Sequence, residues 1–587
     1  MSEYRIYSVN GPVVKVVGGK GLAMMDMVFA GDQQLIGEVV GVEGDMTTVQ
    51  VYEDTAGLAP GQPVTTTGSP MALMLGPGLL GNIFDGIARP LKSLEAISGP
   101  FLGRGVNIPA LDLSKKWDVE ITVKEGDPVK PGTLYAQCQE TSAILHRCLT
   151  PAGLNGTVTR VVPNGPYTVE DVLVEVTDAR GKVTSLKLAT RCTIRGARPI
   201  AQRLPIHRPL ITGQRILDTL FPIGKGGAAA IPGPFGAGKT MTQHQLAKWS
   251  DADIIVYLGC GERGNEMTQA LEEFSELKDP RTGLPLMNRT ILIANTSNMP
   301  VAAREASVYT GMTIAEYYRD MGYHVALMAD STSRWAEALR EISGRLEEMP
   351  AEEGFPAYLA SRLAEFYERA GYVETLEGKE GSVTVIGAVS PQGGDFSEPV
   401  TQNTKRFVRC FWALDRSLAY ARHFPSINWL NSYSEYTVDF KDWYSENVSP
   451  DFAPCRQRIA NLLREESQLM EIVKLIGSDI LPENQKLIME TARLIRLGFL
   501  QQNSYNPVDT YVPLKKQLLM MQTILRLYDG VKEGIDRSIP LSQYTATGIF
   551  DTVVKMKYEI PNEDLSKFDD YAAMIDKALE QVNTANS

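Results

Sequence analysis

Cysteine is scarce in this sequence, with six residues spread over 587 positions and no C-x-x-C pair. Disulfide frameworks and structural zinc sites need closely spaced cysteines, so the spacing argues against both. We expect reduced thiols of an intracellular protein. The six are Cys138, Cys148, Cys192, Cys260, Cys410 and Cys455.

Long apolar runs are also missing. A helix that spans a bilayer needs about 20 consecutive, mostly apolar residues. The best candidate, residues 71–81, is short and is broken by Gly76, Pro77 and Gly78. Residues 1–5 are polar and lack the apolar core of a signal peptide. We therefore expect a cytoplasmic protein that associates with a membrane only through partners.

Positive charge is in deficit, because 58 Lys and Arg face 70 Asp and Glu, for a net charge of −12. Non-specific nucleic-acid binding depends on a basic surface. An acidic total therefore argues against nucleic acid as the main partner, and we expect none.

What the chain does contain is a glycine-rich motif, G-x-x-x-x-G-K-T, the signature of a phosphate-binding loop. A small apolar run at 228–231 precedes it, and apolar residues at helical spacing follow it up to Trp249. Strand, loop and helix in this order are the context that the motif requires. Its residues are Gly233, Pro234, Phe235, Gly236, Ala237, Gly238, Lys239 and Thr240.

These residue types suit a nucleotide polyphosphate. Glycines lack a Cβ, so the backbone N–H groups can turn toward phosphates at the positive end of the following helix. Lys239 would add positive charge at the β- and γ-phosphates, and the Thr240 hydroxyl would bind Mg²⁺. The alternative is an ordinary glycine-rich turn, and the flanking strand and helix argue against it.

The length predicts roughly four domains of about 150 residues. Residues 1–68 alternate short apolar segments with glycine turns, which predicts an N-terminal β-barrel. Residues 69–110 read as the lead-in to the nucleotide domain, and residues 111–200 as an inserted β-rich domain. A phrase at 125–132 resembles turns of lipoyl- and biotin-carrier domains, but no lysine follows at 140–143, so we expect a scaffold without a prosthetic group.

The second half of the chain changes pattern twice. From 201 to 435, short apolar strands alternate with helices, which predicts an α/β nucleotide-binding domain with a mostly parallel sheet. From 436 to 587, apolar residues recur at three- and four-residue spacing, which predicts a helical bundle.

Three charged residues follow apolar strands of the nucleotide domain. Asp330 ends the run 325–329, where a carboxylate can reach a Mg²⁺ hydration shell, although it could instead cap a helix. Glu262 and Arg263 follow the run 254–258. Ligands collect at the carboxyl ends of parallel strands, so this glutamate could polarise an attacking water. The alternative is a surface salt bridge.

Several motifs together resemble the catalytic A subunit of V/A-type rotary ATPases, over nearly the whole chain. The insertion at 111–200 also matches the bulge of these subunits, which is missing from F-type relatives. The motifs are residues 233–240, 259–266, 294–300, 330–338, 390–395 and 422–429.

The resemblance implies a role for each site residue. Lys239 would be the phosphate lysine, Thr240 and Asp330 would hold Mg²⁺, Glu262 would activate water, and Arg263 would lie near the γ-phosphate. It also implies that two aromatic side chains, Phe424 and Tyr505, form the walls of an adenine pocket. The family usually has phenylalanine at the second position. Ala237 replaces the cysteine of eukaryotic vacuolar subunits, which favours a bacterial or archaeal enzyme.

The resemblance further implies an assembly. It comprises a ring of three A and three B subunits, in which the B subunit supplies an arginine finger, with central rotor and peripheral stalk subunits and a membrane ion ring. The expected activity is ATP hydrolysis or synthesis coupled to proton or sodium transport, on the cytoplasmic side of the membrane. Two other hypotheses stay open at this point, a non-catalytic ring subunit and a homohexameric protein-export or nucleic-acid translocase.

Overall fold

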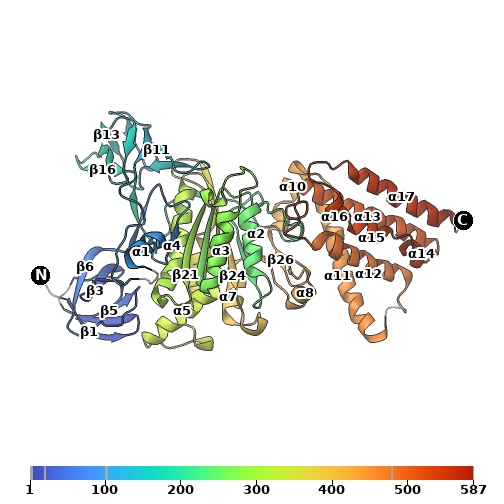
Figure 1. Cartoon of the computed structure of the whole chain (residues 1–587), viewed down its shortest axis with the longest axis horizontal. Helices are drawn as coiled ribbons and strands as arrows, with labels where there is room; N and C mark the ends of the chain where they lie inside the picture. Colours follow the sequence, from blue (N-terminus) through green and yellow to red (C-terminus); the bar gives the residue numbers. More distant parts are fainter. Residues whose placement is uncertain (1–3, 19–20, 100–102, 478–479, 586–587) are drawn as a thin grey trace. The chain divides into compact units, whose positions relative to one another are not determined.

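The computed structural model describes residues 4–18, 21–99, 103–477 and 480–585 (Figure 1). The first three residues, part of the polar start of the chain, lie outside this range. The chain forms two compact units. Unit 1 comprises Met1–Ile206, Lys225–Ala230 and Ala252–Val408, and unit 2 comprises His207–Gly224, Ile231–Asp251 and Arg409–Ser587.

Unit 1 begins with a closed six-stranded antiparallel barrel, as predicted, in the order β1-β2-β5-β4-β3-β6. Valines on alternate positions fill it, among them Val14, Val28 and Val49, because successive side chains of a strand point to opposite faces. The strands are β1 (Tyr4–Asn10), β2 (Val13–Val17), β3 (Asp26–Ala30), β4 (Leu35–Glu43), β5 (Met46–Val51) and β6 (Pro63–Pro70).

The inserted β-rich domain consists of two four-stranded antiparallel sheets, β10-β13-β15-β16 and β12-β11-β9-β14. This confirms the β-rich insertion. Its strands are β9 (Trp117–Ile121), β10 (Pro128–Val129), β11 (Leu134–Gln139), β12 (Leu145–Leu149), β13 (Gly156–Val161), β14 (Gly165–Tyr167), β15 (Val172–Thr177) and β16 (Val183–Lys187). The flanking elements are β7 (Ala72–Leu75), which pairs with β17 (Thr190–Thr193), and α1 (Leu91–Ser98).

A mostly parallel sheet forms the rest of unit 1, as the alternation of strands and helices predicted. Its neighbours β24-β22-β20-β21-β8 all run parallel. They are β8 (Ile83–Phe84), β20 (Ile254–Glu262), β21 (Thr290–Thr296), β22 (His324–Asp330) and β24 (Glu380–Val389). Antiparallel β23 (Gly371–Glu374) joins β24 to β18 (Gln202–Leu204).

Helices cover this sheet (Figure 1). The long α4 (Val301–Asp320) is almost wholly buried and packs along β20, β22 and β24. Because of the parallel arrangement, the carboxyl ends of β20 and β22 lie at the same edge. The other helices of unit 1 are α3 (Gly264–Glu276), α5 (Thr332–Arg345), α6 (Leu359–Glu368) and α7 (Pro399–Phe407).

Unit 2 is mainly helical, which confirms the predicted C-terminal helices. The boundary between the units passes through β19 (Ala228–Pro232). No helix among the described residues is long and apolar enough to cross a membrane. The elements of unit 2 are α2 (Lys239–Trp249), α8 (Arg416–Tyr420), α9 (Tyr436–Asp439), α10 (Lys441–Asn447), α11 (Phe452–Ile476), α12 (Glu483–Ile495), α13 (Leu514–Asp536), α14 (Leu541–Thr545), α15 (Ile549–Val554), α16 (Met556–Glu559), α17 (Lys567–Ala585), strands β25 (Cys410–Phe411) and β26 (Tyr433–Ser434), and two π-helical turns, η1 (Ile216–Leu220) and η5 (Arg496–Leu500).

A buried ion-pair network attaches the barrel to the nucleotide-binding part of unit 1. The Arg195 guanidinium donates to both carboxylate oxygens of Glu305 on α4, at 2.6 and 2.8 Å, and to Glu38 of β4 at 2.8 Å. It also lies 4.6 Å from the ring centre of Tyr309. One side chain thus neutralises two buried carboxylates from segments far apart in sequence.

We expect Arg195→Ala to lower the stability of the chain by roughly 3–5 kcal/mol, because it leaves Glu38 and Glu305 buried without a cation. The shift of the urea unfolding midpoint measures this. The control is Arg160→Ala, which removes an exposed pair with Glu175 at 3.6 Å and should cost under about 1 kcal/mol. Equal shifts in the two variants would contradict the role of the network.

Candidate active site

The phosphate loop lies in unit 2, between the end of β19 and the start of α2 at Lys239, so the expected strand, loop and helix are all present. Two of its glycines have left-handed backbone angles, with φ of +77° at Gly236 and +94° at Gly238. At Gly233 a side chain is excluded by space, because a Cβ there would lie 2.6 Å from the Cβ of Leu414. The loop therefore tolerates glycine alone at these positions without strain.

The side chain of Lys239 folds over the loop. Its Nζ donates to the carbonyl of Gly233 at 2.7 Å and to that of Pro234 at 3.2 Å. Thr240 lies half-buried in the first turn of α2, where helix N–H groups without intrahelical partners form an anion site. Phe235 is 71% exposed at the tip of the loop, so it does not pack in the core of this chain.

A cavity of about 420 Å³ in unit 2 adjoins the loop. Ala237 and Gly238 line it, together with both predicted aromatic residues, Phe424 and Tyr505. The Tyr505 side chain is 87% exposed, so a flat ring is available for stacking. The structure thus brings four of the predicted binding residues to one cavity.

The carboxylates lie in unit 1, at the carboxyl edge of the parallel sheet. Glu262 is the last residue of β20 and Asp330 the last of β22. The two strands are neighbours in parallel register, with Gly259 opposite Asp330. Asp330 is 2% exposed, and the Tyr257 hydroxyl lies 3.4 Å from its Oδ2.

Partial burial, the charge of Asp330 and a hydrogen bond with Glu266 together raise the pKa of Glu262 to about 8. Arg334, in the first turn of α5, lowers it. Gly261 has φ of +72°, and a Cβ there would lie 2.8 Å from the Cβ of Arg334. A half-buried acid whose pKa lies near neutrality suits a proton acceptor.

Arg263 is exposed and stands just before α3. Its position directly after Glu262 places it at the same edge of the sheet, but its contact with a phosphate stays a prediction.

Each predicted Mg²⁺ ligand, taken by itself, has the chemistry that suits Mg²⁺ held on a nucleotide. Among the described residues, no three His, Cys, Asp or Glu side chains cluster into a metal site. Mg²⁺ in nucleotide enzymes takes one or two protein oxygens and several phosphate or water oxygens. The buried carboxylate of Asp330 and the hydroxyl of Thr240 are oxygen ligands of this kind.

Sequence reasoning did not assign several residues that the structure adds. Glu266 and Arg334 act on Glu262, and both lie within segments already noted for their motifs. A second carboxylate four residues after Glu262 could have drawn attention to Glu266. Tyr558 and Gln502 line the cavity of unit 2, and no sequence pattern distinguishes them from other helix and loop residues.

Four family models match successive parts of the chain. They are the beta-barrel domain of the ATP synthase alpha/beta family at residues 6–68, the ATP synthase alpha/beta subunit barrel-sandwich domain at 108–195, the nucleotide-binding domain of the same family at 213–434, and the C-terminal domain of V and A type ATP synthase at 441–545. Together they cover most of the chain.

Similar proteins match over nearly their whole length. A "V-type ATP synthase alpha chain" of Halothermothrix orenii is 60% identical over 97% of each chain, and the corresponding A-type ATP synthase protein of Methanopyrus kandleri is 54% identical over 98% of each. The solved structure of the ATPase EscN, from a type III secretion system of enteropathogenic E. coli, has a TM-score of 0.63 at 21% identity and covers 89% of this chain and 100% of that one. That likeness shows a shared fold alone. By its sequence relatives and its domain models, the chain belongs to the V/A-type ATP synthase catalytic alpha (A) subunits.

Proposed function

We propose that this chain hydrolyses ATP with two groups of residues, the phosphate loop of unit 2 and the carboxylates at the sheet edge of unit 1. The loop N–H groups and Lys239 hold the phosphates, and Glu262 accepts a proton from the water that attacks the γ-phosphorus. The bond from this phosphorus to the β–γ bridging oxygen breaks, and ADP leaves with the electron pair. The observation that carries this proposal is the half-buried Glu262, whose pKa partial burial and the charge of Asp330 raise to about 8.

Other residues of the site bind Mg²⁺, the γ-phosphate and the adenine ring. Thr240 and Asp330 provide oxygens for Mg²⁺, directly or through water, and Arg263 approaches the γ-phosphate. Mg²⁺, when bound, neutralises charge on the phosphate oxygens. Phe424 and Tyr505 stack on the adenine ring. In the reverse direction the same groups bind ADP and phosphate for synthesis.

The chain is one component of a multi-subunit ATP synthase. We further propose that it alternates with a B-type subunit in a ring of three A and three B subunits, and that the B-type subunit supplies an arginine finger. Central and peripheral stalk subunits then connect this ring to a membrane ring that carries protons or sodium ions. The chain would thus lie at the cytoplasmic face of the membrane as a peripheral subunit.

We also propose five functional segments, bounded as in the sequence: 1–68 as the barrel, 69–110 as the lead-in, 111–200 as the bulge, 201–435 as the nucleotide domain and 436–587 as the helical domain. The four family models, with separate matches at 6–68, 108–195, 213–434 and 441–545, support a division of this kind.

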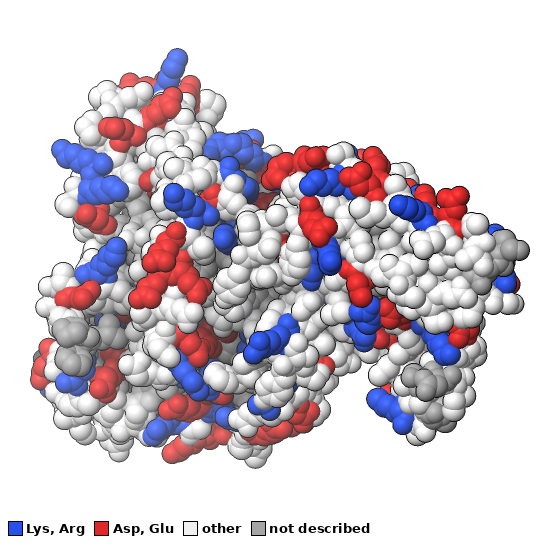
Figure 2. Space-filling model, turned by 45° about the vertical axis from the view of Figure 1, so that its right-hand side comes forward, with Lys and Arg blue, Asp and Glu red and all other residues white. Residues whose placement is uncertain are grey.

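The other two hypotheses lose support. A non-catalytic ring subunit has no need of a half-buried carboxylate with a raised pKa at the sheet edge, yet Glu262 is such a group. A nucleic-acid translocase needs a basic surface, and Figure 2 shows acidic and basic side chains interspersed on the visible face of this acidic chain.

The pH dependence of the assembled enzyme tests the proton acceptor. Because Glu262 must be ionised to take a proton, kcat/KM for ATP should rise with pH and level off above about 8. Arg334→Gln removes a charge that lowers this pKa, so the rise should move to higher pH, whereas Arg334→Lys should leave it in place. An identical pH profile in the Gln variant would contradict this assignment.

Glu262→Gln should lower ATP turnover by the assembled complex by about 10²–10⁴-fold, the usual contribution of a general base. Nucleotide affinity should persist, because the phosphate loop is unchanged, and equilibrium binding of ADP measures it. The control is Glu272→Gln, an equal charge change at an exposed position of α3. Unchanged turnover in Glu262→Gln would favour the non-catalytic hypothesis.

The isolated chain should hydrolyse ATP slowly, because a missing arginine finger costs roughly 10³-fold or more in comparable enzymes. Adding the B-type subunit should restore the rate as the mixed ring forms. Turnover per site by the chain alone that equals that of the mixed ring would show that the site is complete without a neighbour.

A further inference from the structure

The cavity wall that carries Tyr505 is a segment without helix or strand, residues 501–513, between η5 and α13. No helix or strand ladder holds this segment, so its conformation depends on isolated backbone hydrogen bonds and on side-chain contacts. Several of its residues, from Gln501 to Tyr505, line the cavity. What fixes this segment therefore fixes the cavity.

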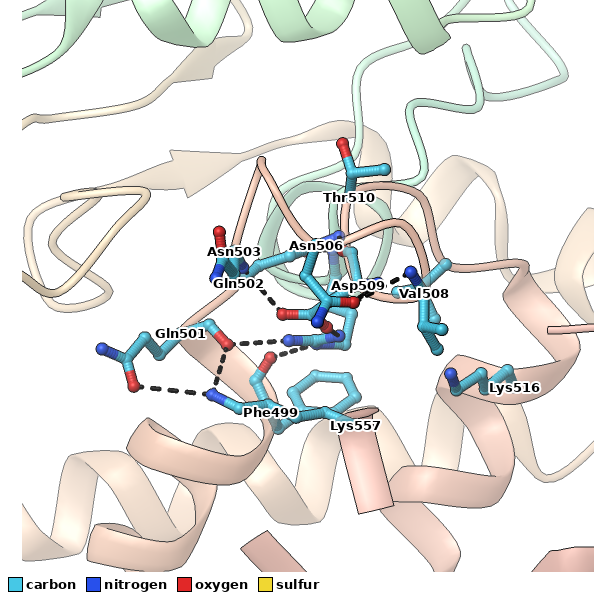
Figure 3. Close-up of polar contacts among 12 residues, drawn as sticks. Phe499, Gln501, Gln502, Asn503, Asn506, Val508, Asp509, Thr510, Lys516 and Lys557 are labelled. Carbon is cyan, nitrogen blue, oxygen red and sulfur yellow. Dashed lines mark hydrogen bonds and ion pairs between the residues drawn. The ribbon is translucent and has the colours of Figure 1, made fainter. Parts of the chain in front are cut away.

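Figure 3 shows residues of the segment around Asp509, which belongs to a fully buried ion pair. Arg215, just before η1, and Asp509 both have side chains that are 0% exposed, and Arg215 Nη1 lies 2.5 Å from Asp509 Oδ1. Arg215 also donates from Nη2 to the carbonyl of Gln501 at 2.7 Å and from Nε to the carbonyl of Phe499. Asp509 Oδ2 accepts the backbone N–H of Asn503 at 2.7 Å. The pair thus holds the segment at Gln501, Asn503 and Asp509.

Gln502 extends this network to the other aromatic wall. Its Oε1 accepts the backbone N–H of Arg215 at 2.8 Å, and its Nε2 donates to the carbonyls of Gly213 and Asp509, each at 2.8 Å. Its own backbone N–H donates to the carbonyl of Phe424 at 2.8 Å. All polar atoms of this buried side chain are therefore used.

Asn503 links the ion pair to Tyr505, because its side-chain Oδ1 accepts the Tyr505 N–H at 2.9 Å. On the other side, Lys557 of α16 donates from Nζ to the carbonyls of Leu497 and Gln501, at 2.7 and 3.2 Å. The next residue, Tyr558, lines the cavity. Tyr505 and Tyr558 are therefore each next to, or bonded to, a residue of this hydrogen-bond network.

We infer that Arg215 and Asp509 are positioning residues for nucleotide-base binding, which hold Tyr505 and Phe424 at the spacing that a planar base requires. The inference rests on the proposed function of the cavity as the adenine site. Neither residue touches the nucleotide. A buried ion pair adds little net stability over apolar residues of the same volume, and its directional bonds favour a role in geometry. The phosphate loop takes no part in these bonds, so phosphate binding should be independent of them.

The test compares ADP with inorganic pyrophosphate, each with Mg²⁺, binding to the full chain by calorimetry. Loss of a stacked wall costs about tenfold or more in affinity. We expect Asp509→Asn to raise the Kd for ADP by about this factor and to leave the Kd for pyrophosphate unchanged. Asn503→Ala, an exposed and milder change, should raise the Kd for ADP in the same selective way but less.

Ile575→Ala in α17 is the matched control for lost stability, because it opens a cavity in the helical bundle at a fully buried residue outside the network. It should lower the melting temperature and leave both Kd values unchanged. If Asp509→Asn does not fold, the Kd values of Asn503→Ala for ADP and pyrophosphate test the positioning role.

Two kinds of failure are distinguishable. If the wild-type chain binds ADP no more tightly than pyrophosphate, or Phe424→Ala leaves ADP binding unchanged, the proposed base site itself is wrong. If those results hold but folded Asp509→Asn and Asn503→Ala bind ADP normally, or lose ADP and pyrophosphate equally, the positioning role is overturned.

Discussion

The parallel register of β20 and β22 is the constraint on which the chemistry of unit 1 depends. Parallel neighbours end at the same edge, so Glu262 and Asp330 come together although they lie 68 positions apart in sequence. Their proximity and burial then set the electrostatics, because a second negative charge opposes ionisation of the first. A shift of this register by one residue would turn one carboxylate to the other face of the sheet.

In unit 2, two segments without helix or strand, the phosphate loop and residues 501–513, must each adopt a defined backbone conformation. In the phosphate loop, glycine permits the required conformation, with left-handed angles at Gly236 and Gly238 and a close approach at Gly233. The segment 501–513 does so with buried polar side chains, above all Arg215 and Asp509. The first solution leaves a clear pattern in the sequence, whereas the second leaves none.

The elements that the sequence predicted correctly are those that depend on residue types and spacing within a short stretch of chain. Apolar runs at 254–258 and 325–329 became β20 and β22, with β20 extending through Glu262, and the glycine motif lies between β19 and α2 as its spacing indicated. The barrel, the β-rich insertion and the C-terminal helices are also confirmed, because each has its own period of apolar residues. Motif resemblance went further and identified the family, which composition and periodicity alone could not do.

The rest was beyond sequence reasoning because it depends on residues far apart in the chain. Arg215 and Asp509 lie 294 positions apart, and neither has a local pattern that indicates a buried pair. The same holds for Arg195 with Glu38 and Glu305. The sequence by itself determined the phosphate loop, the candidate acids and the order of elements, since these follow from local residue types and spacing. Only the tertiary structure decided how strongly Glu262 holds its proton and what supports the walls of the cavity, because burial and long-range pairing exist only in the folded chain.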